Sequence, residues 1–193
     1  MGRIRTERLE LIAAEPHVAI AEAAGASDWF RELSVPAPIT WPPPLSDADS
    51  LKWFADRIAA DPSAVGWFAW YVVHAQDARV LIGNCGFKGR PDPAGSVEIG
   101  YALLPSHQRQ GLGTELTGAL IGWAFEHGAV ARITAETLPE LTASIRVLEK
   151  HGFQLMGRGS AAGLIRFELR RAVFERRRGV SAPGSRASQS EGS

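Results

Sequence analysis

The sequence predicts an α/β protein whose central sheet is mostly antiparallel, and two observations lead to this prediction. Segments rich in alternating or β-branched apolar residues, which are typical of strands, are interleaved with segments whose apolar residues recur at helical spacing. Most strand segments follow one another through short turns, which favours antiparallel pairing, and a parallel join is expected where a helix intervenes. We therefore expect one layered α/β (α+β) domain with about seven strands flanked by helices.

The individual elements follow from local patterns along the chain. Strands are expected at residues 4–14, 66–74, 80–88, 96–104, 132–137, 153–158 and 164–171. Helices are expected at residues 16–24, 28–33, 47–60, 111–127 and 142–151. Ser46 is the expected N-cap of the third helix, and Gly128 and Gly152 are expected to end the last two. The proline-rich run at 36–44 must be extended, because proline blocks a helix at itself and just before it.

The domain organisation follows from length and from a change in composition near the C-terminus. A chain of 193 residues suits a single domain with one sizeable core. From about Gly179 the sequence becomes rich in Ser, Gly and Ala and loses apolar periodicity. We expect one domain at residues 1–178 and a disordered tail at 179–193.

Charge and cysteine content exclude several classes of protein. Lys+Arg and Asp+Glu both number 21, so the chain lacks the positive excess of a sequence-independent nucleic-acid binder. Cys85 is the single cysteine, which excludes an internal disulfide and a cysteine-based metal cluster and fits a reducing compartment. No apolar run approaches the ~18–20 residues of a membrane span. We expect a cytoplasmic protein without a metal ion that binds neither nucleic acid nor membranes.

The run from Gln108 to Gly113 has the features of an anion site. It follows a predicted strand and opens directly into a long helix, whose first turn offers free backbone N–H groups and the positive end of the helix dipole. Glycines at 111 and 113 let a phosphate approach the backbone, Arg109 adds charge and Thr114 adds a hydroxyl. The residues that mark a P-loop or a Rossmann dinucleotide site are missing. Alone, this pattern is weak, because Gly-x-Gly at the start of a helix is more often a feature of helix packing.

A second motif changes the interpretation of this loop. The chain from Pro105 to Phe153 resembles the GNAT superfamily of N-acetyltransferases, specifically its ribosomal-protein (Rim-type) acetyltransferase-like branch. Gln108–Gly113 matches that family's pyrophosphate loop, and Thr142–Phe153 looks like the branch's closing helix with its Leu-Glu-Lys-x-Gly-Phe end. Thr6–Leu11 is similar to its opening strand. The resemblance spans about residues 4 to 172 and implies a GNAT-like fold, with acetyl-CoA bound in a V-shaped split of the sheet.

The resemblance also implies which residues bind the cofactor. The backbone of Leu103 would pair with the acetyl-pantetheine arm, and the closing helix would contribute Ser144. The residues that would hold the pyrophosphate are Gln108, Arg109, Gln110, Gly111, Leu112, Gly113 and Thr114. The family's usual Asn before the closing helix falls at Leu141, which cannot hydrogen-bond the pantetheine. Either Thr142 or Glu140 replaces it, or cofactor binding is weaker, or the protein is a degenerate member.

The expected reaction is direct acetyl transfer to a neutral amine, without a metal. A lysine-like amine is neutral in only ~one part in a thousand at neutral pH, so a general base is worth ~10²–10⁴-fold. Glu136, on the strand before the closing helix, is the favoured base, and Glu98, on the strand across the split, is the alternative. Many GNAT enzymes use a tyrosine at the position of Leu148 to protonate the leaving thiolate, so Ser144 is the expected substitute.

The acceptor is less well defined by the sequence. A protein or peptide N-terminus is the first expectation, and a small amine is nearly as well supported. Tryptophan and phenylalanine side chains that could wall an amine-binding cleft are Trp29, Phe30, Trp41, Trp67 and Trp70. Two alternatives remain open: a non-catalytic acyl-CoA-binding regulatory module and an interaction protein that has lost the cofactor. A homodimer is a reasonable default, although the sequence does not indicate it.

Overall fold

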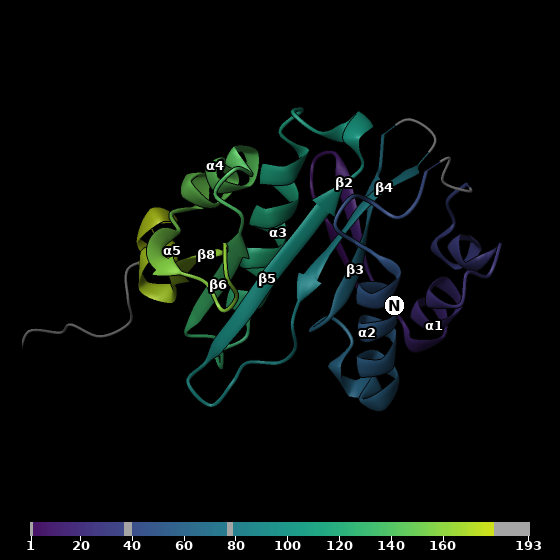
Figure 1. Ribbon diagram of the computed structural model, residues 1–193, viewed down its shortest axis with the longest axis horizontal. Coiled ribbons are helices and arrows are strands. Elements are labelled where there is room, and N and C mark those ends of the chain that lie inside the picture. The colour runs from purple at the N-terminus through teal and green to yellow at the C-terminus, as the bar shows by residue number, and fades with distance from the viewer. Residues whose placement is uncertain (1, 37–39, 77–78, 180–193) are drawn as a thin grey trace, which may run out of the picture.

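The computed structural model describes residues 2–36, 40–76 and 79–179, in which eight strands form one sheet (Figure 1). The strands are β1 (Arg3–Arg5), β2 (Leu9–Ala13), β3 (Ala69–His74), β4 (Val80–Phe87), β5 (Ser96–Leu103), β6 (Arg132–Thr137), β7 (Gln154–Arg158) and β8 (Ile165–Arg170). The helices are α1 (Pro16–Ala23), α2 (Ala48–Ala60), α3 (Leu112–Glu126), α4 (Thr142–His151) and α5 (Arg171–Arg177). Short 3₁₀ turns are η1 (Trp29–Leu33), η2 (Pro62–Ala64) and η3 (Pro105–His107). The expected tail from residue 180 onward lies outside the described residues.

The strand order is β1-β2-β3-β4-β5-β6-β8-β7. Every neighbouring pair is antiparallel except β5 and β6, which are parallel. The helix α3 connects these two strands, and a parallel join needs such a crossover. The predicted fold class, a mixed and mostly antiparallel sheet flanked by helices, is confirmed.

The opening segment differs from the prediction. Residues 4–14 were expected to form one strand, but the chain turns back within them and forms the β1–β2 hairpin. The amide of Thr6 donates to the carbonyl of Leu9 (2.9 Å), which closes the turn over the polar residues between them. The sheet therefore has eight strands instead of about seven.

Two helix assignments also need correction. Asp47, not Ser46, is the N-cap of α2, because its carboxylate accepts a hydrogen bond from the amide of Ser50 (2.8 Å). At the other end, the chain after β8 forms α5, where the sequence indicated only a strand end. Arg171 begins this helix, and its guanidinium donates to three carbonyl groups, one in the last turn of α3 and two in the segment that follows it. The acceptors are Phe125 (2.7 Å), His127 (2.7 Å) and Val130 (2.9 Å).

The helices cover the two faces of the sheet, as the alternation of side chains along β3 shows. The ring of Trp70 packs against Trp123 of α3, with centroids 5.3 Å apart. The next residue, Tyr71, donates its hydroxyl to Glu22 of α1 (2.6 Å). Because successive strand residues point to opposite faces, α3 and α1 lie on opposite sides of the sheet.

The parallel pairing between β5 and β6 is short. Residues Ser96–Glu98 pair with Arg132–Thr134, and beyond them β5 continues beside β4 to Leu103 while β6 continues beside β8 to Thr137. Figure 1 shows the long β5 diverging from β6. The sheet therefore opens into a split that begins directly after Glu98.

A buried charge network ties the first strands together. The Glu10 side chain on β2 is 1% exposed and contacts Arg3 (2.7 Å), Arg5 (3.3 Å) and Arg79 (2.5 Å). Burial alone would raise the pKa of this carboxyl, but hydrogen bonds and charges of Arg3 and Arg79 outweigh it and hold the pKa at about 2. The carboxylate is therefore ionised throughout the neutral range.

The first prediction concerns this network. Glu10→Gln should lower the free energy of unfolding at pH 7 by about 2–3 kcal/mol, because it leaves partly buried guanidinium groups without a counter-charge. The folded pKa lies below the unfolded value of 4.5. The stabilisation is therefore complete above pH 4.5 and declines as the pH falls toward 2. Urea denaturation at pH 7 and pH 3 measures both effects.

The control for this experiment is Asp56→Asn, which removes an exposed ion pair with Lys52. That change should alter stability by less than about 0.5 kcal/mol. An equally small effect of Glu10→Gln at pH 7 would contradict the role assigned to the network.

Candidate active site

The loop between β5 and α3 has an unusual backbone. Arg109 (φ 60°) and Gly111 (φ 78°) both adopt left-handed conformations, and Gly111 occupies the N-cap position of α3. Glycine adopts this conformation without strain, whereas the same geometry costs roughly 1–2 kcal/mol at Arg109. The turn directs the free N–H groups of the first turn of α3 toward one point. Such a cradle fits a pyrophosphate.

Two glutamine side chains hold this loop in shape. Gln108 donates its side-chain amide to the carbonyl of Leu103 (2.9 Å), and Gln110 donates to the carbonyl of Ser106 (2.9 Å). Both side chains therefore fix the backbone of the loop. Arg109 lies in the loop itself and has an exposed side chain that can supply positive charge to an anion.

The opening hairpin anchors the loop from the other side. Arg8 donates to the carbonyl of Gln110 (2.9 Å) and pairs with Glu115 of α3 (2.7 Å). The other oxygen of Glu115 accepts from the Arg8 amide (2.8 Å) and from the hydroxyl of Thr6 (2.5 Å). Burial raises the pKa of Glu115, but these hydrogen bonds outweigh it and lower the pKa overall. The motif around Thr6 is thus physically part of the loop's support.

Three further residues that were expected to bind the cofactor contribute to the packing of α3. Leu112 is buried in the core, so its contribution to the cradle is its backbone. Gly113 lies close to Val147 of α4 and would place a Cβ 3.7 Å from it. The carbonyl of Thr114 accepts from Nε2 of His151 (2.9 Å), which joins the start of α3 to the end of α4.

The unpaired side of β5 faces the split. The amide of Leu104 donates to Ile82 of β4 (2.8 Å), and along an antiparallel strand the groups that bond to one neighbour alternate. Leu103 and Tyr101 therefore direct their backbone N–H groups away from β4, into the split. This geometry suits the expected pairing of Leu103 with an extended ligand.

A hydroxyl pair lies on the α4 side of the split. The phenol of Tyr101 lies 3.1 Å from Oγ of Ser144 and 3.3 Å from its carbonyl oxygen. Burial raises the pKa of Tyr101, more than its hydrogen bonds lower it. The phenol therefore stays protonated at neutral pH and can donate. Sequence analysis missed Tyr101, although its position two residues before Leu103 places it on the same face of β5.

The two candidate bases have different surroundings. The Glu136 side chain is 3% exposed and is held by Ser160, through its amide (2.8 Å) and hydroxyl (2.6 Å), and by Arg166 (2.7 Å). Burial raises its pKa, but these partners outweigh it and lower the pKa overall. A carboxylate with a lowered pKa and occupied oxygens is a poor proton acceptor, and its partners lie in and before β8, so these contacts argue against the expected role of Glu136.

Glu98 is located at the start of the split. It is the last β5 residue that pairs with β6, and it forms an ion pair with Lys88. Side chains at alternate positions share a face, so Glu98 lies on the same face as Gly100 and Ala102. These two residues and Lys88 line a cavity described below.

Leu141 lies at the start of α4. It occupies the N-cap position of α4 without a side-chain hydrogen bond, and its carbonyl accepts from the amide of Ile145 (3.1 Å). The amide of Thr142 donates to the carbonyl of Glu140 (2.8 Å). No polar side chain stands at 141 to bind a pantetheine.

A cavity of about 180 Å³ lies between α1, α2 and strands β3 to β5. Its walls are mostly apolar, and its polar side chains include Glu22, Asn84 and Ser46. Beside it, Trp29 packs against Trp41 and Tyr71, with ring centroids 5.5 and 5.2 Å apart. The T-shaped contact between Trp29 and Phe30 extends this cluster (6.2 Å).

Two of the expected cleft residues pack on the α3 face. Trp67 and Trp70 both pack their rings against Trp123 of α3 and support the core. Trp70 also lines the cavity near α1, whereas Trp67 does not.

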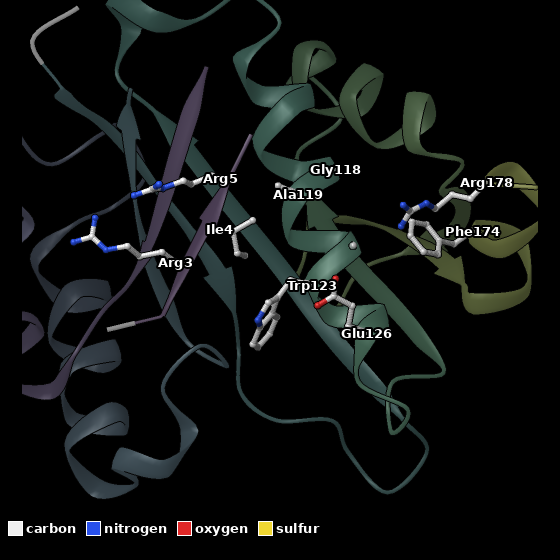
Figure 2. Close-up of a pocket in the computed structure, with 10 residues that line it drawn as sticks. Arg3, Ile4, Arg5, Gly118, Ala119, Trp123, Glu126, Phe174 and Arg178 are labelled. Atoms are coloured by element: carbon white, nitrogen blue, oxygen red, sulfur yellow. The ribbon is translucent and has the colours of Figure 1, made fainter. Parts of the chain in front are cut away.

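A second, larger cavity of about 640 Å³ is formed by β1, α3 and α5 (Figure 2). Figure 2 shows Ile4 on one side, Gly118 and Ala119 on α3, and Phe174 and Arg178 on the other side. None of the site residues expected from the sequence lines it.

Comparisons with known proteins decide the family. The acetyltransferase (GNAT) domain family matches residues 8–154, which is most of the chain. YjdG of Bacillus subtilis (strain 168), an uncharacterized N-acetyltransferase, is 32% identical over 158 residues, or 80% of this chain and 91% of YjdG. This chain belongs to the GNAT acetyltransferase family.

Solved structures share the GNAT fold. RimL, a ribosomal L7/L12 alpha-N-protein acetyltransferase in complex with coenzyme A, superimposes with a TM-score of 0.64 at 18% identity, covering 89% of this chain and 99% of RimL. A ribosomal-protein-S5-alanine acetyltransferase from Vibrio fischeri gives a TM-score of 0.61 at 19% identity, covering 88% and 97%. At this identity the likeness shows the fold alone.

Family membership indicates the acyl donor of this protein. GNAT proteins are acetyl-CoA-dependent N-acetyltransferases, and the present chain is one of them. Acetyl-CoA supplies a thioester whose acyl group is transferred. In the described part of the chain, no cluster of His, Cys, Asp and Glu is arranged to hold a metal ion. No described helix combines the length and apolar character of a membrane span.

The second prediction tests the anchoring of the loop. Arg8→Gln should raise the dissociation constant for coenzyme A by about 5- to 30-fold, because it removes a charge-assisted hydrogen bond that holds Gln110 in place. Titration calorimetry measures this effect, and circular dichroism checks that the fold is retained. Arg31→Gln, at an exposed position in η1, is the matched control. Unchanged affinity of a folded Arg8→Gln protein would show that the loop needs no such anchor.

Proposed function

We propose that this N-acetyltransferase transfers acetyl directly from acetyl-CoA to a neutral primary amine held in the α1/α2 cavity. The observation that carries the proposal is the split after Glu98. The anion cradle lies at the far end of β5, and the cavity reaches β5 on the opposite face from α3 and α4. Donor and acceptor can therefore approach β5 from different sides.

The donor site would use the backbone more than side chains. The pyrophosphate would occupy the cradle formed by the left-handed turn at Gly111 and the first turn of α3. The pantetheine arm would pair with the N–H groups of β5 that face the split, at Leu103 and Tyr101. With Leu141 unable to contribute, this strand would carry most of the polar recognition of that arm.

Glu98 is the base that the surroundings favour, in place of Glu136. It lies at the mouth of the split and on the cavity side of β5, beside Lys88. A carboxylate there can accept the proton of an incoming ammonium, directly or through a water molecule. Glu136 then serves to fix the turn before β8 through Ser160 and Arg166.

Ser144 and Tyr101 are the proposed proton donors to the departing thiolate. Their hydroxyl groups are 3.1 Å apart, so a proton that leaves Ser144 can be replaced from the phenol. The amine nitrogen first forms a tetrahedral intermediate with the acyl carbon and gives its proton to Glu98. As the bond between the acyl carbon and sulfur breaks, the sulfur takes the proton and the amide forms, and the phenol of Tyr101 regains its proton from water. Tyr101 would thus supply the proton that a tyrosine at the position of Leu148 supplies to the thiolate in many GNAT enzymes.

The acceptor is proposed to be a primary amine, either the α-amine of a protein or peptide or the amine of a small molecule. The solved structures of this fold include enzymes named for ribosomal proteins, which supports a protein N-terminus. The cavity of about 180 Å³ has room for one side chain or a small amine. An α-amine with a pKa near 7.7 is neutral to about a fifth at pH 7 and needs less help from a base.

The third prediction distinguishes the two carboxylates. Glu98→Gln should lower kcat by about 10²- to 10⁴-fold at pH 7, because the amine then loses its proton acceptor. The loss should shrink at higher pH, where more of the amine is already neutral. Thiol release from acetyl-CoA with a panel of amines measures the rate.

Glu136→Gln is the comparison, and Glu126→Gln, at an exposed position, is the control. If Glu136→Gln causes the larger loss of kcat in a protein of unchanged thermal stability, the base is Glu136. Coenzyme A binding without turnover of any amine would instead support a non-catalytic acyl-CoA-binding module.

The fourth prediction concerns the hydroxyl pair. Ser144→Ala and Tyr101→Phe should each lower kcat on the order of 10²-fold with little change in coenzyme A affinity. Because the two groups act as one unit, the double variant should be little slower than either single variant. Stopped-flow measurement of a single turnover reports the chemical step. Full additivity of the two losses would contradict the shared proton path.

A further inference from the structure

Glu22 is a carboxylate in the wall of the acceptor cavity, and its partners are neutral. Its Oε1 accepts from the indole N–H of Trp41 (2.7 Å) and its Oε2 from the phenol of Tyr71 (2.6 Å). Trp29 packs against both rings and holds them in place. The carboxylate is therefore fixed in orientation by three aromatic residues.

The other well-buried carboxylates of the described chain are paired with arginine. Glu10 contacts Arg3 and Arg79, Glu115 contacts Arg8, and Glu136 contacts Arg166. Within the described residues, Glu22 has no such ion pair. Burial raises the pKa of Glu22, only partly offset by the hydrogen bonds from Tyr71 and Trp41. A cation beside Glu22 would favour the charged form of its carboxyl group. The described residues supply no such cation, so a cationic ligand would stabilise the carboxylate.

Glu22 is nevertheless accessible to a ligand. It lines the same cavity as Gly100 and Ala102 of β5, and each of its oxygens keeps a second lone pair after accepting one hydrogen bond. Lys88 lines the cavity too, but it is paired with Glu98 at the β5 side. The cavity thus has the Glu22 carboxylate in a mostly apolar wall, and Glu98 lies outside the lining, beside Lys88 and on the same face of β5 as Gly100 and Ala102.

From this arrangement we propose that Glu22 binds a second cationic group of the acceptor, an ammonium or guanidinium distinct from the amine that is acetylated. This inference rests on the proposed function, because it assigns the reacting amine to the β5 end of the cavity. The preferred substrates are then amines that carry a further positive charge at the end of an apolar chain.

The register of the sheet sets the distance between the two groups. Tyr71 on β3 pairs with Asn84 on β4, which pairs with Ala102 on β5. Two strand spacings of about 4.8 Å separate the partner of Glu22 from β5. An extended chain advances about 1.25 Å per bond, so this span of about 9.6 Å sets an upper limit of roughly eight bonds between the two nitrogens. Cadaverine and a lysine residue at a peptide N-terminus, whose nitrogens are about six bonds apart, fall within this limit.

The test compares matched acceptors that differ only in the second charge. Cadaverine is compared with pentylamine, and a peptide that begins with lysine is compared with the same peptide beginning with norleucine. For the wild-type protein, kcat/KM should be at least about tenfold higher for the charged member of one or both pairs, mainly through KM. A preference in the first pair alone identifies a small diamine, and a preference in the second alone identifies a peptide.

The variant that tests the residue is Glu22→Gln, which keeps the shape and removes the charge. The preference for the charged acceptor should fall by about tenfold or more, toward no preference. Glu32→Gln, at an exposed position in η1, should leave the preference unchanged. Calorimetric titration of wild-type protein loaded with coenzyme A should show cadaverine binding more tightly than pentylamine, which requires no variant.

The outcomes separate this inference from the proposed function. If the amines are acetylated at equal efficiency in both pairs, or if Glu22→Gln keeps the full preference, the role of Glu22 is overturned while the transferase mechanism stands. If coenzyme A binds and none of the acceptors is acetylated, the proposed function fails and the inference fails with it.

Discussion

The structure of the site depends on the point where β5 and β6 stop pairing. Three residues of each strand form the parallel ladder, and after Glu98 the two strands follow different neighbours. The backbone groups of β5 that face the split then need hydrogen-bond partners, since unpaired backbone groups inside a protein are destabilising. An extended ligand could supply those partners, and in the proposed donor site the loop at the end of the same strand would fix its position. Binding by strand geometry, as proposed, would make the lack of a polar side chain at Leu141 compatible with a working donor site.

Because side chains alternate along β5, the two faces of the sheet carry different groups of the proposed mechanism. Tyr101 and Leu103 point toward α3 and α4, where the hydroxyl of Ser144 and the cradle lie, whereas Glu98, Gly100 and Ala102 lie on the face of α1 and α2. The proposed proton acceptor, Glu98, and the proposed proton donors thereby lie on opposite sides of one strand. Groups separated in this way can hold opposite protonation states at one pH, as the proposed transfer from an ammonium to a thiolate requires.

Sequence analysis predicted the sheet type and most strands and helices, because these features depend on local periodicity, and it placed the glycine-containing loop directly before α3. It could not show that the segment before Leu9 turns back, since the alternating pattern continues through the turn. It also favoured Glu136, because strand position alone does not reveal that Ser160 and Arg166, 24 and 30 residues further on, occupy the carboxylate. Tyr101 and Glu22 were missed for the same reason: their significance comes from contacts with Ser144 and Tyr71, across 43 and 49 residues of sequence.

Four carboxylates, those of Glu10, Glu22, Glu115 and Glu136, show how one chemical group is used in different surroundings. Three of them are neutralised by arginine and stabilise the first hairpin, the loop support and the turn before β8. A buried carboxylate without a cation is less favourable by several kcal/mol than one in a good ion pair, about the size of a large mutational effect. Glu22 is tolerated with only neutral donors because Trp41 and Tyr71 satisfy one lone pair of each oxygen. The carboxylate still lacks a positive charge beside it. A positively charged ligand supplies that charge and a neutral ligand of the same shape does not, so the cavity is selective for cationic ligands.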